Sequence, residues 1–230
     1  MRKSSVYLTD DLKAELAALA ARWGRSEAEL IRLAIEQLVR RGEEDGAPAR
    51  ARPVAAGPRL VGVGVGPSDP DLVTERALTV LHAADRVYAP STGPDAISRA
   101  EAVVRAAAPE LGVDRLVIEI GTDETARARS IDAGAAQLIA HLDRGELVAL
   151  VVLGDPNVYS VFTRVAALVA AARPSVPIET VPGIMAFQDL AARTSTVLAD
   201  GDEELAVITL GRDASRLEPL LGDPTRTIVI

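Results

Sequence analysis

The sequence predicts an α/β protein built on a largely parallel β-sheet, with a small additional unit at its N-terminus. Apolar, β-branched runs at 59–66 and 146–153 are typical of strands that are buried on both faces. Helical patterns alternate with these and other strand-like runs, which indicates parallel strands joined by crossover helices. A stretch rich in Gly, Pro, Ala and charge, without apolar periodicity, predicts a linker. We therefore expect a small unit at 1–42, a linker at 43–57 and the sheet domain at 58–230.

The composition excludes several classes of protein and site. The 230 residues include no cysteine and only two histidines, so disulfides and cysteine nucleophiles are impossible and we expect no metal site. We expect both histidines, His82 and His141, at the surface. The net charge of −8 argues against a protein coated in nucleic acid. No apolar run is long enough to cross a membrane and the N-terminus lacks an apolar signal core, so we expect a cytoplasmic protein.

The N-terminal unit is predicted to contain one strand and two helices. Residues 3–8 form the strand, and 10–22 form a helix with its leucines on one face. Ser26 followed by Glu29 is a capping box that begins a second helix, which ends near residue 41. So few elements cannot bury their own apolar faces, and the strand has two unpaired edges. Pairing with a second copy of the chain would solve both problems, so we expect a homodimer.

This unit resembles the ribbon-helix-helix family of DNA-binding proteins. The resemblance rests on the Lys3–Leu8 strand, the Gly24-Arg25-Ser26 turn and the helix that begins at Ser26. It implies that the paired strands enter the major groove and that outward-facing strand residues read bases, while the turn contacts phosphate. The implied DNA-binding residues are Lys3, Ser5, Tyr7, Arg25 and Ser26. A dimerisation arm or an ordinary helical hairpin is the alternative interpretation.

The sheet domain is predicted to alternate strands with helices, and three special loops follow its strands. Ligands in such sheets bind beyond the carboxyl ends of the strands. The loops at 64–71, 154–160 and Pro182-Gly183 all occupy that position. The expected strands are 59–66, 86–89, 115–120, 146–153, 177–181, 204–210 and 227–230, and the expected helices are 71–83, 96–108, 124–143, 158–172 and 184–193.

The glycines of the first loop do not have the spacing of a dinucleotide-binding site. Gly62, Gly64 and Gly66 lie two residues apart, whereas that pattern is G-x-G-x-x-G. Two interpretations stay open for them: they let a ligand approach the backbone, or they allow close packing of strand and helix.

Three motifs in order resemble the tetrapyrrole (corrin/porphyrin) methylases, a family of two-lobed α/β enzymes that use S-adenosylmethionine. They are VGVGVGPSDP at Val61–Pro70, LGDP at Leu153–Pro156 and VPG at Val181–Gly183. The resemblance implies a cofactor site at Val65, Pro67, Leu153, Gly154, Asp155, Val158, Met185 and Ala186.

The last two of these positions depart from the family, which usually carries Thr or Ser there. Neither Met185 nor Ala186 has a hydroxyl group to bond the cofactor. Further strands and a helix follow residue 230 in the family, so we expect the second lobe to be incomplete. Asp155 lines the cofactor site or merely caps the next helix. Tyr159 is the candidate catalytic residue, as a substrate contact or proton handler, and a buried packing tyrosine is the alternative.

The residues around these motifs are similar to those of precorrin-2 C20-methyltransferases. The similar segments are Leu153–Phe162 (LGDPNVYSVF), Pro182–Gln188 (PGIMAFQ) and Leu198–Glu203 (LADGDE). They imply methylation at C20 of precorrin-2, or of its cobalt form cobalt-factor II, in cobalamin biosynthesis. The alternative is a ribbon-helix-helix regulator whose degenerate methylase domain senses S-adenosylmethionine or a corrinoid.

Overall fold

The computed structural model describes residues 10–23, 25–35, 54–208, 221–222 and 225–230. The chain divides into two compact units, residues 1–52 and 53–230, which are treated separately below. The predicted strand at 3–8 lies outside the described residues.

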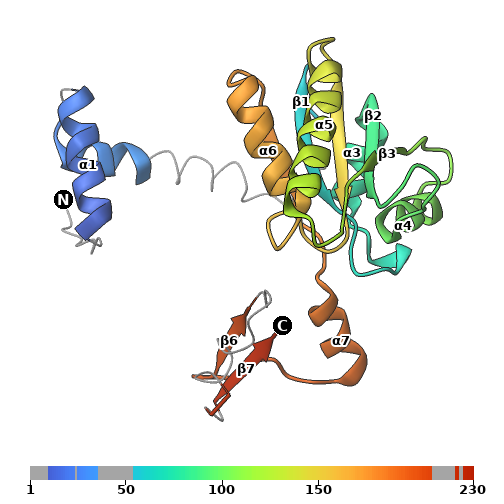
Figure 1. The fold of residues 1–230 in the computed structure, drawn as a ribbon. Coiled ribbons are helices and arrows are strands. Elements are labelled where there is room, and N and C mark those ends of the chain that lie inside the picture. The colour runs from blue at the N-terminus through green and yellow to red at the C-terminus, as the bar shows by residue number, and fades with distance from the viewer. Residues whose placement is uncertain (1–9, 24, 36–53, 209–220, 223–224) are drawn as a thin grey trace. The chain divides into compact units, whose positions relative to one another are not determined.

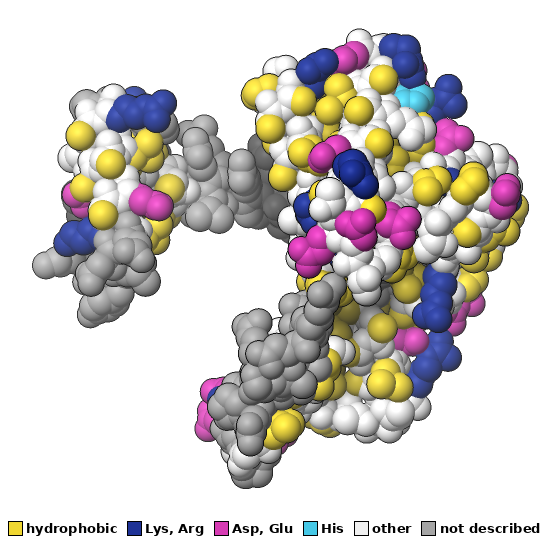
Figure 2. Space-filling view, in the orientation of Figure 1, with side chains coloured by type: hydrophobic (Ala, Val, Ile, Leu, Met, Phe, Trp, Pro, Cys, Tyr) yellow, Lys and Arg dark blue, Asp and Glu magenta, His cyan; other side chains and the backbone are white. Residues whose placement is uncertain are grey.

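The described residues of the first unit form two helices, as predicted. Helix α1 spans Asp10–Trp23, and a second helix runs from 27 through the last described residue, 35. The predicted capping box is confirmed, because the Glu29 amide donates to Ser26 Oγ at 3.3 Å and the Ser26 amide donates to Glu29 Oε2 at 3.1 Å. Ala20 and Leu30 are buried, but other apolar side chains stay exposed (Figure 2).

The second unit is built on a five-stranded parallel sheet, which confirms the predicted fold class. The strand order is β3-β2-β4-β1-β5. The two strands with continuous apolar runs, β1 and β4, therefore lie side by side. Every residue of both strands is buried, which explains why their sequences are continuously apolar. The strands are β1 (Arg59–Gly64), β2 (Arg86–Ser91), β3 (Asp114–Val117), β4 (Leu147–Val152) and β5 (Ile178–Val181).

Helices cover both faces of this sheet (Figure 1). Alternate residues of the strands point to opposite faces. Val61 and Val63 therefore pack with α3 (Glu75–Ala83) and α4 (Arg99–Ala107), whereas Leu60 packs on the other face. The helices on that other face are α5 (Glu124–Leu142) and α6 (Val161–Ala172).

A smaller second lobe follows the sheet. Helix α7 (Ala186–Thr194) leads to two strands, β6 (Glu204–Val207) and β7 (Arg226–Val229). These strands pair in parallel, with Glu204 opposite Arg226. The two strands predicted near the chain end are thus confirmed, although β6 ends earlier than predicted.

Several helices begin later than the sequence pattern predicts, because capping residues set their first turns. The helix predicted over 71–83 is a short 3-10 turn, η1 (Pro70–Leu72), followed by α3. Thr74 caps α3 by accepting from the Ala77 amide at 3.1 Å. Ser160 caps α6 in the same way, so the segment predicted as its first turn is a loop. The remaining boundaries differ from the prediction by a few residues, which is usual at helix and strand ends.

The prediction that both histidines lie at the surface is wrong for His141. Its ring bridges the buried Tyr88 hydroxyl, 2.8 Å from Nε2, and the Glu146 carboxylate, 2.6 Å from Nδ1. Hydrogen bonds from Arg144 and His141 lower the pKa of Glu146 to about 2. His82 is exposed, as predicted, and contacts Glu110. Both histidines are thus engaged in contacts within the fold rather than at the sheet edge where ligands bind.

Candidate functional site

Three loops converge at the carboxyl edge of the parallel sheet. They follow β1, β4 and β5, and β1 lies between the other two strands. A Cβ on Gly64 would collide with the Gly154 carbonyl oxygen and would lie 2.6 Å from the Gly183 nitrogen. A Cβ on Gly183 would collide with the same oxygen. The three backbones are therefore in direct contact, and glycine is required at both positions.

Hydrogen bonds hold the same loops in register. The Gly154 amide donates to the Gly66 carbonyl at 2.9 Å, and both residues have positive φ angles, 69° and 77°. Asp155 Oδ2 accepts from the Gly183 amide at 3.2 Å, while its Oδ1 accepts from the Asn157 amide at 2.8 Å. One carboxylate thus ties the loop after β4 to the loop after β5.

The surroundings of the three glycines of the first strand and loop bear on the interpretation of close packing. A Cβ on Gly62 would lie 2.7 Å from the ring of Phe162 on α6, and the nearest atoms beside Gly66 belong to Leu72. The space beside Gly62, Gly64 and Gly66 is filled by protein. Close packing of strand and helix is confirmed for Gly62, whereas a Cβ on Gly64 would meet the Gly154 and Gly183 backbones instead of a helix. The approach of a ligand to these backbones stays a prediction.

A cavity of about 400 Å³ opens beside these loops, a size within the range of small-molecule sites. Seven of the eight predicted cofactor residues line it. The eighth, Val65, has its side chain fully buried in the core, and its amide donates to the Val152 carbonyl at 3.0 Å. The seven lining residues are Pro67, Leu153, Gly154, Asp155, Val158, Met185 and Ala186.

Asp155 is not the cap of the following helix, as one interpretation had it. Ser160 caps α6 by accepting from the Phe162 amide at 3.1 Å. Both oxygens of Asp155 instead accept from loop amides. Asp155 therefore shapes the cavity wall that it also lines.

The opposite wall of the cavity comes from the second lobe. Val207 and Ile208 at the end of β6, and Val229 and Ile230 at the end of β7, line it together with Phe187. Sequence reasoning missed these residues because their strands look like ordinary core strands. The available signal was that 204–210 and 227–230 both end in apolar residues, but nothing in the sequence indicates that these ends face the first lobe.

Tyr159 lies at the mouth of the cavity and is 82% exposed, so the interpretation of a buried packing tyrosine is wrong. Its φ angle is 46°, in the left-handed region that costs a residue with a side chain about 1 kcal/mol or more. An exposed aromatic side chain held by a strained backbone is available to contact a bound molecule.

Met185 is the N-cap of α7, at the position where a hydroxyl group was expected from the resemblance. Its φ and ψ of −82° and 153° suit an N-cap, but its thioether makes no capping hydrogen bond. Gln188 compensates in part, because its Oε1 accepts from the Met185 amide at 2.9 Å. The Gln188 amide in the first turn of α7 donates to the Met185 carbonyl at 3.0 Å, so a backbone acceptor is used where a hydroxyl group would usually accept.

The predicted DNA-binding residues are described only in part. Lys3, Ser5 and Tyr7 lie outside the described residues. Arg25 and Ser26 are exposed, but the Ser26 hydroxyl is engaged in the capping box. Hydrogen bonds from Ser26 lower the pKa of Glu29 and keep this carboxylate charged at the helix N-terminus.

Among the described residues, no three His, Asp or Glu side chains gather as metal ligands would. Within the same ranges, no helix is both long enough and apolar enough to span a membrane.

Two protein families match this chain. Residues 59–230 match the Tetrapyrrole (Corrin/Porphyrin) Methylases, and residues 5–42 match the ribbon-helix-helix proteins of the copG family. A Methanocaldococcus jannaschii protein named "Probable cobalt-precorrin-2 C(20)-methyltransferase" is 30% identical over 158 residues, which cover 69% of this chain and 66% of that protein. The precorrin-2 C(20)-methyltransferase of a Sinorhizobium species is 31% identical over 180 residues, covering 75% and 72%. The chain thus spans about two thirds of the length of these relatives.

Solved structures share the fold. A cobalamin synthesis related protein (CobF) from Corynebacterium diphtheriae superposes with a TM-score of 0.54 at 21% identity, covering 65% of this chain and 63% of that one. The uroporphyrin III C-methyl transferase of Thermus thermophilus gives a TM-score of 0.50 at 23% identity, covering 74% and 69%.

Asp155→Ala tests whether one carboxylate holds two of the loops together. The substitution leaves the Gly183 and Asn157 amides without their acceptor, which should lower the free energy of unfolding by about 2 kcal/mol. The melting temperature should fall by roughly 5 °C. The matched control is Asp71→Ala, because the exposed Asp71 carboxylate accepts no hydrogen bond in the described structure. Equal melting temperatures for the two variants would contradict this role of Asp155.

Met185→Thr tests the effect of adding a side-chain hydroxyl group at the N-cap of α7. A threonine hydroxyl accepts from an amide of the first turn, so the free energy of unfolding should rise by about 1 kcal/mol, measured by urea denaturation. Met185→Leu has no hydroxyl and serves as the control, with a change below about 0.5 kcal/mol expected. A threonine variant no more stable than the leucine variant would show that Gln188 already satisfies this helix end.

Proposed function

We propose that this chain, which belongs to the tetrapyrrole (corrin/porphyrin) methylase family, transfers a methyl group from S-adenosylmethionine to C20 of precorrin-2 or of cobalt-factor II in cobalamin biosynthesis. The observation that carries this proposal is the convergence of seven predicted cofactor residues, from three separate loops, on one cavity. The names of the two similar relatives support the choice of C20 of precorrin-2.

The cavity suits a cofactor with both apolar and charged parts. Leu153, Val158 and Met185 offer apolar contact, and Gly154, which has no side chain, lines the cavity with its backbone. Asp155 adds a carboxylate to the wall. Because its two oxygens are already fixed by amide donors, a bound cation would meet it without any rearrangement of the loop.

When bound, S-adenosylmethionine supplies an electrophilic methyl group on a sulfonium. The reduced tetrapyrrole is electron-rich at its meso carbons, so the substrate provides its own nucleophile. What the protein contributes is position: the locked loops hold the two reactants in line, which supplies roughly 7–11 kcal/mol of barrier lowering in well-oriented reactions. The apolar ends of β6 and β7 keep water from that side of the cavity. Tyr159, exposed at its mouth, contacts the substrate.

Gly183→Ala tests the proposed cofactor site, since a Cβ there collides with the Gly154 carbonyl oxygen and separates the loops. Calorimetry should detect S-adenosylmethionine binding to the wild-type chain, and an anaerobic assay should detect methylation of precorrin-2. Both should be lost in Gly183→Ala. Gly112→Ala is the control, because a Cβ at Gly112 meets no atom within 4 Å, and it should keep both.

The outcomes separate the candidate functions. Binding without methyl transfer by the wild-type chain would overturn the enzyme and leave a sensor of the cofactor. No binding of S-adenosylmethionine at all would overturn the enzyme and the sensor of this cofactor, and would leave only a sensor of a corrinoid. Retained binding in Gly183→Ala would mean that the cofactor lies elsewhere.

The match of residues 5–42 to ribbon-helix-helix proteins favours a second function, DNA binding by a homodimer in the cytoplasm. The first unit leaves Leu12 49% and Ile35 47% exposed, apolar surface that a second copy could cover. Residues 1–42 carry eight Lys or Arg against six Asp or Glu, whereas residues 43–230 carry 17 against 27, so the first unit is the better candidate for DNA contact.

Salt-dependent binding to random duplex DNA tests this second function. The full chain should bind DNA at low salt. Arg25→Gln should make the slope of log affinity against log salt shallower by the amount expected for about one phosphate contact. The control is Arg99→Gln, an exposed arginine of the second unit, whose slope should equal that of the wild type. No binding at low salt would leave dimerisation as the role of residues 1–42.

A further inference from the structure

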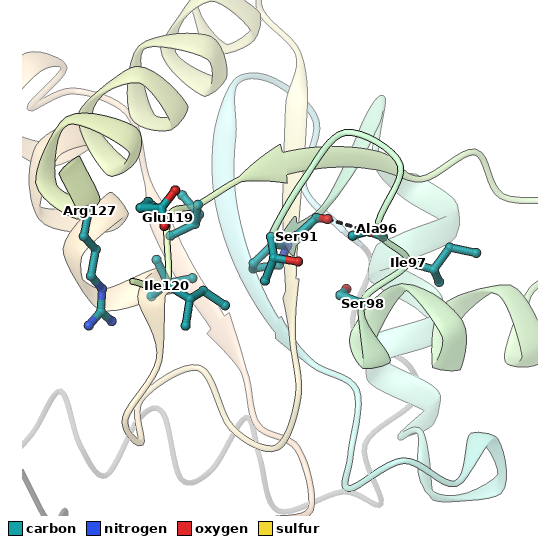
Figure 3. A pocket seen from close by; sticks show the side chains of 11 residues that line it. Ser91, Ala96, Ile97, Ser98, Glu119, Ile120 and Arg127 are labelled. Carbon is teal, nitrogen blue, oxygen red and sulfur yellow. Dashed lines mark hydrogen bonds between the residues drawn. The ribbon is translucent and has the colours of Figure 1, made fainter. Parts of the chain in front are cut away.

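A second cavity, of about 340 Å³, lies at the same edge of the sheet as the cofactor cavity. It is formed at the carboxyl ends of β2 and β3 (Figure 3). Its lining is mostly apolar and includes Ile97, Ile118 and Ile120. The loop after β2 is held in shape by Ser91, whose buried hydroxyl lies 2.5 Å from the Ala96 carbonyl oxygen. The cavity is therefore preformed and apolar, which suits the edge of an organic ring.

A polar pocket of about 530 Å³ adjoins it, because Arg127 lines both. Arg127 comes from the first turns of α5, and Arg164, from the first turns of α6, lines the polar pocket as well. Figure 3 shows Arg127 on one side of the apolar cavity, with Ser91 and Ser98 on the other. An apolar cavity with one arginine in its lining and a second arginine in the adjoining pocket suits a ligand with an apolar body and anionic side chains.

Several arginines of the second unit are held by carboxylates, so their charges are already neutralised. Arg115 binds the buried Glu101, and Arg173 binds Asp143 at 2.6 Å. In the part of the chain that the structure describes, neither Arg127 nor Arg164 has a carboxylate partner for its guanidinium. Both charges are therefore free to meet an anion.

Three acidic side chains lie on the neighbouring segments, and two of them are engaged. Asp123 caps α5 by accepting from the Thr125 and Ala126 amides. Glu119 accepts from the Gly121 amide at 3.1 Å. Glu124 lines the polar pocket together with the two arginines and opposes an anion there.

The loop after β4 lies between the two cavities and sets the distance between them. The loop after β4 supplies Gly154–Tyr159 to the cofactor cavity, and Val161, directly after it, lines the apolar cavity. Strand β4 lies between β1 and β2, so the strand ends that carry the two cavities are about 10 Å apart at about 4.8 Å per strand. A ligand as large as a tetrapyrrole can reach from one to the other.

We propose that Arg127 and Arg164 bind carboxylate side chains of the tetrapyrrole substrate, while the apolar cavity receives an edge of its macrocycle. The two arginines are then positioning residues that turn one meso carbon toward the cofactor cavity. This inference rests on the proposed methylation of precorrin-2, whose acetate and propionate groups supply the anions.

Substitutions of opposite expected sign test the proposal, with precorrin-2 titrated anaerobically into the full chain and followed by its absorbance. Arg127→Gln and Arg164→Gln should each raise the Kd about fivefold, the effect expected of an exposed ion pair. Glu124→Gln should lower the Kd because it removes the opposing charge. Arg129→Gln, an exposed arginine of the same helix that lines neither cavity, should leave the Kd unchanged.

Two further readouts distinguish binding of carboxylates from a general effect on the fold. The loss caused by Arg127→Gln should shrink at high salt, and the affinity for S-adenosylmethionine should equal that of the wild type. Equal Kd values for Arg127→Gln, Arg164→Gln and Arg129→Gln would overturn the proposal and leave the methyltransferase function standing. If the wild-type chain does not bind precorrin-2 at all, both the proposed function and this inference fail.

Discussion

The backbones of Gly64, Gly154 and Gly183 approach so closely that the loops after β1, β4 and β5 form one rigid group. Gly64 and Gly183 have no space for a Cβ, and Gly154 has a φ angle of 69° that disfavours any side chain. The parallel sheet makes this contact possible, because it brings the carboxyl ends of neighbouring strands to one edge. The position of the cavity follows from it, since the loops that carry these glycines form one wall of the cavity and the second lobe forms the other.

The other residues of the site lie in the same three loops or directly after them. Asp155 adds a carboxylate that accepts from two loops, and Tyr159 and Met185 are placed at the cavity by the turns on which they lie. The loop after β4 continues directly into α6, whose first turns carry Val161 and Arg164 toward the second cavity. One loop thus relates the position of the proposed cofactor to the position of the proposed substrate. This arrangement suits a transfer reaction in which the protein mainly orients two bound molecules.

The sequence predicts the sheet well because its central strands are buried on both faces and their apolar runs are continuous. It also predicts the three loops, since glycine and proline interrupt those runs at strand ends. It does not predict what the glycines contact, because Gly64 and Gly183 are 119 residues apart and only the folded sheet brings them together. The contribution of Val229 and His141 was missed for the same reason: an apolar or helical pattern does not specify which partner a side chain meets.

Hydrogen–deuterium exchange of the full chain with and without S-adenosylmethionine tests most directly that the three loops act as one site. Ligand binding should slow exchange at 65–70, 153–159 and 183–188 together, because the contacts of Gly64, Gly154 and Gly183 couple these segments. Exchange in the paired outer strand β3 should not change. Protection of only one loop, or protection confined to other parts of the chain, would contradict a single cofactor site built on these glycines.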